Sequence, residues 1–189
     1  MAYIIHLLIL IGIYSTLAVS LNLVVGYTGL LSVTHAAFFG LGAYATAIIL
    51  TMSGIGFFLS VLIGIVVALI ISFLIGLVLS KFNDDYYALA SLGFGVIAFS
   101  VFLNWQSLTR GPLGIPGISR PEIFGFKLAE NLHFLILVLA IFLLIYWFSR
   151  FIVNSSFGRV LKAIREDEEA IQIFGYNTLY YKLAIFVIS

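Results

Sequence analysis

Long apolar stretches dominate the chain and alternate with short clusters of Gly, Asn, Ser and Pro. A helix of about 20 residues crosses the ~30 Å apolar core of a bilayer. Apolar runs of this length, without the period-two alternation of barrel strands, predict helices. The sequence therefore predicts an all-α, polytopic transmembrane helix bundle in one membrane domain, 1–189. Its five complete spans lie near residues 4–24, 31–51, 57–79, 87–104 and 132–149, and a sixth begins near Tyr180 and is cut off at Ser189.

Composition supports a membrane protein and excludes several other classes. Hydrophobic residues make up 63% of the chain and charged residues only 9%, whereas a soluble domain carries roughly 25% charged residues. The first 80 residues contain no charged side chain at all. With a net charge of +1, the chain is not expected to bind nucleic acid, and it is too apolar to be a soluble enzyme or a disordered chain.

The charged residues fall in three linkers, 80–86, 105–131 and 150–182. Five complete spans place the first and third linkers on one side of the membrane. Those two linkers carry more Lys and Arg than the second, so the positive-inside rule predicts that 80–86 and 150–182 are cytoplasmic. The N-terminus and 105–131 are then expected outside.

Small residues recur at every fourth position of the third span, a spacing that lets membrane helices approach closely. The second span shows a shorter stripe at Ser32, Ala36 and Gly40. Both stripes are interpreted as helix-packing faces rather than as sites for a solute. The third-span stripe consists of Ser60, Gly64, Ala68, Ser72, Gly76 and Ser80.

Polar residues within membrane spans are candidates for function. Here the candidates for a translocation path are Asn22, Thr28, Ser32 and His35. A structural hydrogen bond is favoured over solute contact for His35. Gly26 and Gly29 either break a helix or make a tight turn between two spans. At the cytoplasmic end of the fourth span, Tyr86 and Tyr87 are interpreted as interface aromatics.

The segment 150–182 contains an amphipathic pattern that predicts a cytoplasmic helix or helix pair. Asn154-Ser155-Ser156 offers residues that start a helix, and Gly175 offers a left-handed C-cap. Three interpretations are open: a solvated linker helix, a helix on the lipid surface, and a docking element for a cytoplasmic protein. Mixed charges beside the apolar stripe favour docking. The stripe consists of Phe157, Val160, Leu161, Ile164, Ile171 and Phe174, opposite Arg159, Lys162, Arg165, Glu169 and Gln172.

Several motifs resemble those of a known family. Glu169-Ala170-Ile171, followed after three residues by Gly175, resembles the loop by which permeases of ATP-driven importers engage their ATPases. The chain as a whole resembles the branched-chain amino acid permease family, and its larger, M-type subunit in particular. The motifs that carry this resemblance include 22–29, 35–44, 85–88, 92–95, 109–115, 156–159, 162–166 and 182–189. Arg110 and Val96 depart from the family pattern.

The resemblance implies a permease subunit that carries Leu, Ile or Val and works with a second permease subunit, two cytoplasmic ATPases and an external solute-binding protein. It implies a location in the prokaryotic cell (inner) membrane, among lipids. ATP and Mg²⁺ would be bound by the partner ATPase and no cofactor by this chain. Members of the family are longer than 189 residues, so the chain resembles a truncated permease. The docking residues implied are Phe157, Gly158, Arg159, Ile164, Arg165, Glu169, Ala170 and Gly175.

Other functions are open but less favoured. The sequence contains no GxxxxGK[ST] phosphate loop, no cysteine and no closely spaced histidines, so neither nucleotide binding, a metal site nor a catalytic residue is expected. A membrane hydrolase has only Asp84-Asp85 as an acidic pair near a span end. A proton- or sodium-coupled carrier usually keeps carboxylates within its spans, and these spans have none. The remaining alternatives are an inactive truncated fragment and a permease for urea, amides or other amino acids.

Overall fold

The computed structural model describes residues 2–82, 84–118, 122–123, 126–127 and 130–189, with the backbone alone at 2, 84, 122–123 and 126–127. Within these ranges five helices are long and apolar enough to cross a membrane. Each corresponds to one predicted span, with ends that differ from the predicted ones by at most five residues, which confirms the all-α class and the five spans. They are α1 (Ala2–Thr28), α2 (His35–Ser53), α3 (Phe57–Leu79), α4 (Asp84–Asn104) and α6 (Asn131–Asn154).

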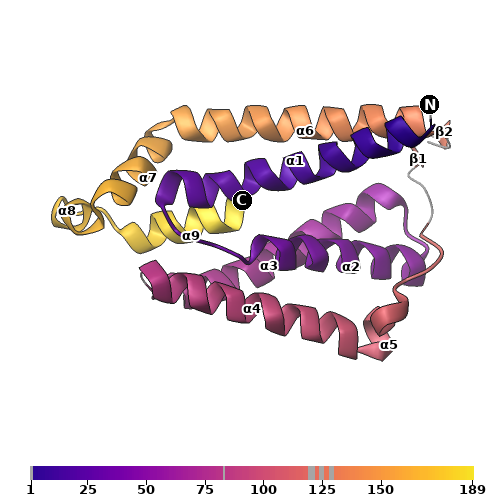
Figure 1. Ribbon diagram of the computed structural model, residues 1–189, viewed down its shortest axis with the longest axis horizontal. Coiled ribbons are helices and arrows are strands. Elements are labelled where there is room, and N and C mark those ends of the chain that lie inside the picture. The colour runs from indigo at the N-terminus through magenta and orange to yellow at the C-terminus, as the bar shows by residue number, and fades with distance from the viewer. Residues whose placement is uncertain (1, 83, 119–121, 124–125, 128–129) are drawn as a thin grey trace.

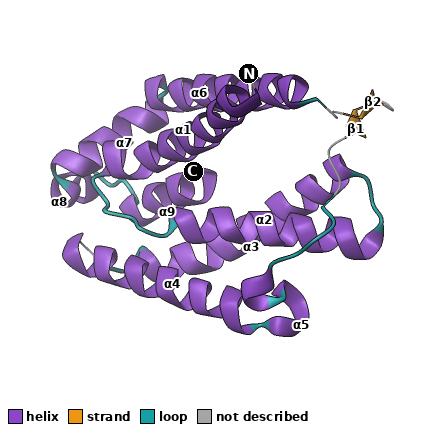
Figure 2. Ribbon diagram, turned by 45° about the vertical axis from the view of Figure 1, so that its right-hand side comes forward, coloured by secondary structure: helices purple, strands orange, loops and turns teal. Residues whose placement is uncertain are grey.

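The helices form two layers (Figures 1 and 2). In one layer α1 packs along α6, and in the other α2 packs along α3 while α4 lies against α2. A short helix, α9 (Thr178–Ile188), enters between the layers and contacts both α3 and α1. The sixth apolar segment, predicted to begin near Tyr180, is this helix.

Short elements lie at both ends of the bundle (Figure 1). Helices α7 (Ser156–Glu166) and α8 (Glu168–Ile173) follow α6 at one end. At the opposite end are α5 (Gln106–Thr109), the 3-10 helix η1 (Gly111–Leu113) and two strands, β1 (Glu122–Ile123) and β2 (Phe126–Lys127). The strands pair antiparallel, and no strand was predicted there because two-residue strands leave no periodic pattern in the sequence.

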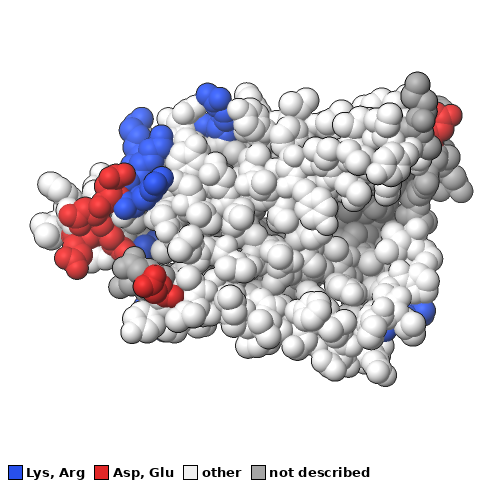
Figure 3. Space-filling model, in the orientation of Figure 1, with Lys and Arg blue, Asp and Glu red and all other residues white. Residues whose placement is uncertain are grey.

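Charged side chains gather at the end of the molecule that carries α7 and α8, and the sides of the bundle are almost free of them (Figure 3). The turn between α3 and α4 lies at this same end (Figure 1). The linkers 80–86 and 150–182 therefore share one end, as the alternation of spans predicts. The side chains of Asp84, Arg120, Glu122 and Lys127, which belong to the charged linkers, lie outside the described residues.

The sides of the bundle expose large apolar side chains. Leu62 on α3 is 58% exposed, Ile97 on α4 63% and Trp147 on α6 75%. Exposing such side chains to water over whole helix faces is unfavourable, whereas lipid tails solvate them readily. These faces therefore suit contact with lipid or with other transmembrane helices.

The face of α4 that turns inward is set by helical spacing. Tyr87, Ser91 and Ala98 are buried, whereas Tyr86 is 70% exposed. The interpretation of both tyrosines as interface aromatics is wrong for Tyr87, which is 2% exposed and packs with Leu79 and Phe186. One residue along a helix turns the side chain by about 100°, so adjacent tyrosines face different surroundings.

The small-residue stripe of α3 contacts two different helices. A Cβ added to Gly64 would lie 2.2 Å from Thr46 Oγ1 of α2, and one added to Gly76 would lie 2.7 Å from Leu183 of α9. Ser60 is fully buried, and Ser72 is 7% exposed. In the second span the stripe of Ser32, Ala36 and Gly40 is not one packing face, since Ser32 precedes α2 and Ala36 is exposed.

Candidate functional site

The first candidate site is the break between α1 and α2. Helix α1 ends at Thr28 and Gly29 has a positive φ of 76°, after which the chain runs without helical structure to Thr34. Figure 1 shows that this segment runs from the charged end toward the middle of the molecule, so α2 begins at some distance from the charged end. The structure thus contains a helix break at Gly29 rather than a tight turn, and Gly26 remains within α1.

Buried hydroxyl and imidazole groups line this break. Ser32 Oγ lies 2.8 Å from Thr34 Oγ1 and 3.5 Å from His35 Nδ1. His35 Nε2 lies 3.1 Å from Ser189 Oγ, and Ser91 Oγ of α4 accepts a hydrogen bond from Val33 N at 3.1 Å. Non-helical backbone at membrane depth needs such partners, because lipid supplies none. The break is therefore held on three sides, by α2, α4 and α9.

Of the four predicted path residues, the structure brings Thr28, Ser32 and His35 together at the break, and all three are buried. Asn22 is separate from them, exposed on α1. Two members of the network, Thr34 and Ser91, were not singled out in the sequence. The signal that could have identified them was a hydroxyl side chain within an apolar run. This signal is weak, because several serines in these helices, such as Ser72, donate to a carbonyl of their own helix.

A cavity of about 590 Å³ lies between the two layers, bounded by α1, α3, α6 and α9 and by the start of α2. Its walls are mostly apolar, with Leu17 and Phe148 among the lining residues, and His35 reaches it from the break. Ala68 and Ser72 of the α3 stripe also line it. Ser149 Oγ is buried at this cavity without a hydrogen-bond partner among the described residues.

The second candidate site is the charged end, where α6 turns into α7. Ser155 caps α7 by accepting a hydrogen bond from Gly158 N at 3.3 Å. A Cβ added to Gly158 would lie 2.3 Å from Val153 O, so only glycine permits this sharp turn. Leu161 and Ile164 of α7 are buried, and Leu161 packs with Leu23 of α1 and Ile185 of α9.

The predicted amphipathic segment is a pair of helices that meet at Asp167. Asp167 Oδ1 accepts a hydrogen bond from Ala170 N at 2.9 Å and so caps α8. After α8, Gly175 has a φ of 85°, and its N–H donates to Gln172 O at 2.9 Å. This left-handed termination agrees with the C-cap predicted at Gly175.

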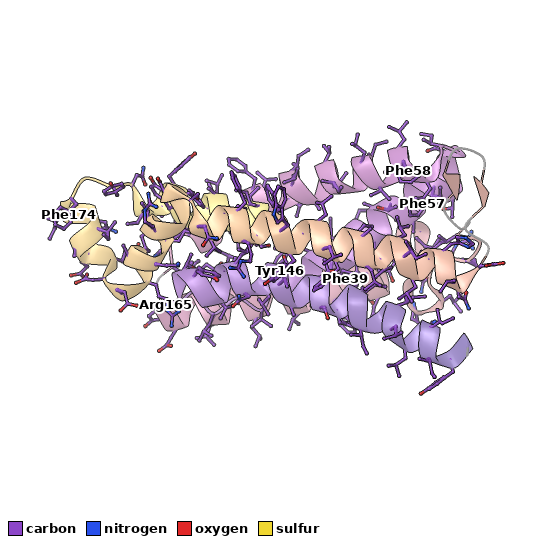
Figure 4. The ribbon with its side chains drawn as sticks, turned by 90° about the horizontal axis from the view of Figure 1, so that it is seen from above. Phe39, Phe57, Phe58, Tyr146, Arg165 and Phe174 are labelled. Carbon is purple, nitrogen blue, oxygen red and sulfur yellow. The ribbon has the colours of Figure 1, made fainter. Side chains whose placement is uncertain are left out.

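The predicted docking residues are divided between interior and surface. Gly158 and Ile164 are buried and Phe157 is half-buried, because α7 uses its apolar stripe to pack on the bundle. Ala170 is half-buried, while Arg159, Arg165, Glu169 and Gly175 are exposed. The most exposed apolar side chains of the segment are Ile173 and Phe174, at 86% and 77%. Phe174 lies at the tip of the charged end (Figure 4).

Helix α8 is joined to α9 by polar contacts. Lys182 Nζ forms an ion pair with Glu168 Oε2, and Gln172 Nε2 donates to Thr178 Oγ1 at 2.9 Å. Lys182 is only 3% exposed. Sequence reasoning placed Lys182 in a charged linker and missed this contact. The available signal was a single lysine within the apolar run 179–188.

Two cations of α7 contact the end of α1. Arg165 Nη1 donates to Gly26 O at 2.6 Å, and Lys162 Nζ lies 5.5 Å from the centroid of the Tyr27 ring. Arg165 points from α7 toward α1 (Figure 4).

The two candidate sites are thus the helix break after α1 and the charged turn from α6 into α7 and α8. The model of the family described as "Branched-chain amino acid transport system / permease component" matches residues 3–189. The chain belongs to this family. It is consequently a multi-pass protein of the prokaryotic inner membrane, as its five apolar helices indicate.

Curated relatives of this permease-family chain are M-type subunits, as the motifs suggested. The high-affinity branched-chain amino acid transport system permease protein LivM of Escherichia coli (strain K12) is 32% identical over 94% of this chain and 47% of the relative. The probable branched-chain amino acid transport permease protein LivM of Methanocaldococcus jannaschii is 29% identical over 97% of this chain and 62% of the relative. The chain thus spans about half the length of its E. coli relative. No solved structure matches it.

Proposed function

We propose that the chain is the transmembrane permease subunit of an ATP-driven importer for branched-chain amino acids. The observation that carries this proposal is the family match over 3–189 together with relatives described as branched-chain amino acid permease proteins. The chain's role is transport, without bond chemistry of its own.

ATP and Mg²⁺ are held by partner ATPases, because the 189 residues contain no phosphate-binding loop. The proposed assembly contains a second permease subunit, two cytoplasmic ATPases and an external solute-binding protein. The translocation path uses the helix break at Thr28, Ser32 and His35 and the adjoining cavity between the layers. Its apolar walls suit an aliphatic side chain, and the hydroxyl and imidazole groups suit its polar end.

Uptake of labelled leucine tests the proposal. The complete transporter is expressed in cells that lack their own branched-chain permeases, and uptake is compared with and without competing isoleucine, valine or urea. We expect ATP-dependent leucine uptake that isoleucine and valine inhibit. Uptake inhibited by urea alone would assign a different solute, and no uptake by an assembled complex would refute the function.

The ATPase is proposed to contact the tip of α8 rather than the apolar stripe of α7. The α7 stripe is covered by α1, α6 and α9, whereas Ile173 and Phe174 are exposed beside Glu169. Exposed apolar side chains beside charges are typical of anchors in a protein interface. The charged side chains around these anchors would then determine how the ATPase is oriented on α8.

Replacing both anchors with serine tests this contact. We expect Ile173→Ser with Phe174→Ser to reduce ATPase co-purification at least tenfold, because the interface loses its apolar anchors, while membrane abundance is unchanged. Leu113→Ser is the matched control, since Leu113 is 92% exposed and lies at the opposite end of the bundle. Undiminished co-purification by the double variant would exclude α8 as the docking tip.

A further inference from the structure

The C-terminal end of α1 has a carbonyl group that the helix itself does not satisfy. In an uninterrupted helix Gly26 O would accept from Leu30 N. Here the chain turns away at Gly29, and Leu30 N instead faces Thr28 Oγ1 at 3.4 Å. Arg165 of α7 donates to Gly26 O at 2.6 Å in its place. A cation also complements the negative end of the α1 dipole.

A second cation and an apolar contact strengthen this attachment. Lys162, one turn before Arg165, lies 5.5 Å from the centroid of the Tyr27 ring, within cation–π distance. On the inner face of α7, Leu161 is fully buried and packs with Leu23 of α1. Helix α7 thus holds the last two turns of α1 by a hydrogen bond, a cation–π contact and apolar packing.

Arg165 also lies against the break itself. A Cβ added to Gly29 would lie 3.2 Å from Arg165 Cγ, so the aliphatic part of the arginine side chain packs on Gly29, the first residue after α1. From there the chain leads in a few residues to the buried network of Ser32, Thr34 and His35. A displacement of α7 would therefore reach the candidate path through this segment.

We propose that Arg165 is a positioning residue that fastens α7 to the end of α1, so that α7 and the break at Gly29 move as one unit and convey ATPase-driven motion to the path. This inference rests on the proposed function. It differs from a docking role for Arg165, because the guanidinium is engaged within the chain. Arg150, at the end of α6, provides a comparison, since it is an exposed arginine whose Nη1 donates to Tyr146 Oη of its own helix at 3.3 Å.

The test compares Arg165→Gln with the matched control Arg150→Gln in the complete transporter. Four quantities are measured: membrane abundance, ATPase co-purification, ATP hydrolysis and leucine uptake. We expect Arg165→Gln to reduce uptake at least tenfold while abundance, co-purification and hydrolysis stay within twofold, and Arg150→Gln to change uptake less than twofold. Loss of co-purification would make Arg165 a docking residue and overturn the proposal, as would unchanged uptake.

A cross-link keeps the proposal testable if Arg165→Gln is depleted from the membrane. The 189 residues contain no cysteine, so Tyr27→Cys with Lys162→Cys can be bridged by a short thiol reagent, with the single variants as controls. If α7 and the end of α1 move as one unit, the bridged double variant retains at least half of its leucine uptake. If this contact must open during transport, bridging abolishes the uptake. If the unaltered complex takes up no leucine, the proposed function fails. The rate of bridging then decides the inference: equal rates with and without ATP support one moving unit, and a rate that ATP changes more than tenfold overturns it.

Discussion

Arg110 has a left-handed backbone conformation, with φ 60° and ψ 14°. The neighbouring turn imposes it. Thr109 Oγ1 lies 2.7 Å from Phe102 O, Gly111 N donates to Thr109 Oγ1 at 3.2 Å, and a Cβ on Gly111 would lie 2.7 Å from Leu103 O. The sequence identified Arg110 as a departure from the family's glycine pattern, and the structure shows that glycine suits this position.

We expect Arg110→Gly to raise the thermal midpoint of the detergent-solubilised protein. The left-handed region costs an L-residue about 1–2 kcal/mol, and the greater freedom of glycine in the unfolded chain offsets about 0.4–1 kcal/mol of that gain. The net gain in unfolding free energy is therefore between about 0 and about 1.6 kcal/mol. Arg110→Ala is the control, because it removes the side chain but keeps the Cβ. A midpoint raised equally by Ala would show that the backbone strain is unimportant.

Residue type alone selected the candidate path residues, and it did not tell which of them lie together. Thr28, Ser32 and His35 were candidates because polar groups are uncommon in spans, and the structure buries all three at one break. Asn22 met the same criterion but faces outward. Sequence alone does not tell which face of a uniformly apolar helix turns inward, because such a helix has almost no amphipathic pattern.

At the scale of elements, the pair Glu168 and Lys182 joins α8 to α9. The two members differ in burial, since the Lys182 side chain is 4% exposed and the Glu168 side chain 27%. A buried ion whose partner is removed remains desolvated and uncompensated, at a cost of about 3–5 kcal/mol. The partly exposed Glu168 carboxylate regains some water when it loses its partner.

This asymmetry predicts unequal effects of the single substitutions. We expect Glu168→Ala to lower the unfolding free energy by up to about 3 kcal/mol, and Lys182→Met, which removes the buried charge, to lower it less. The double variant is expected to be more stable than Glu168→Ala alone. Thermal unfolding of the unaltered protein, the two single variants and the double variant in one detergent measures the coupling between Glu168 and Lys182. Additive effects of the two substitutions would show that the pair is not coupled.

Helix boundaries were predicted best where a residue has a specific local role. Ser155 caps α7 and Gly175 ends α8, as their residue types indicated. The division of 155–178 into two helices at Asp167 follows from its capping side chain. The partner of a charged side chain is a different case: Arg165 donates to Gly26 O of α1, because a partner from another element competes with a local one.

At the scale of the whole molecule, the charged side chains drawn in Figure 3 gather mainly at the end of the bundle that carries α7 and α8. The positive-inside rule assigns the end with α7 and α8 to the cytoplasm. Lys81 lies in the turn at this end, and Leu113 lies in η1 at the other.

Cysteine labelling in intact cells tests this orientation. We expect Leu113→Cys to react with a membrane-impermeant maleimide, and Lys81→Cys to react only after the membrane is permeabilised. Both positions are exposed, so access and not burial decides the result. The reverse pattern would invert the topology and place the proposed ATPase contact on the wrong side.

The sequence by itself determined the class of protein, the number of complete spans, the shared end of the charged linkers and the family. Each of these depends on composition, run length or local motifs, which tertiary packing does not alter. Only the tertiary structure decided that α1 breaks at Gly29, that the α7 stripe packs inward, and that Arg165 holds Gly26 and Lys182 holds Glu168. These features depend on contacts between segments as far as 154 positions apart, and no local pattern encodes which partner a buried or charged side chain meets.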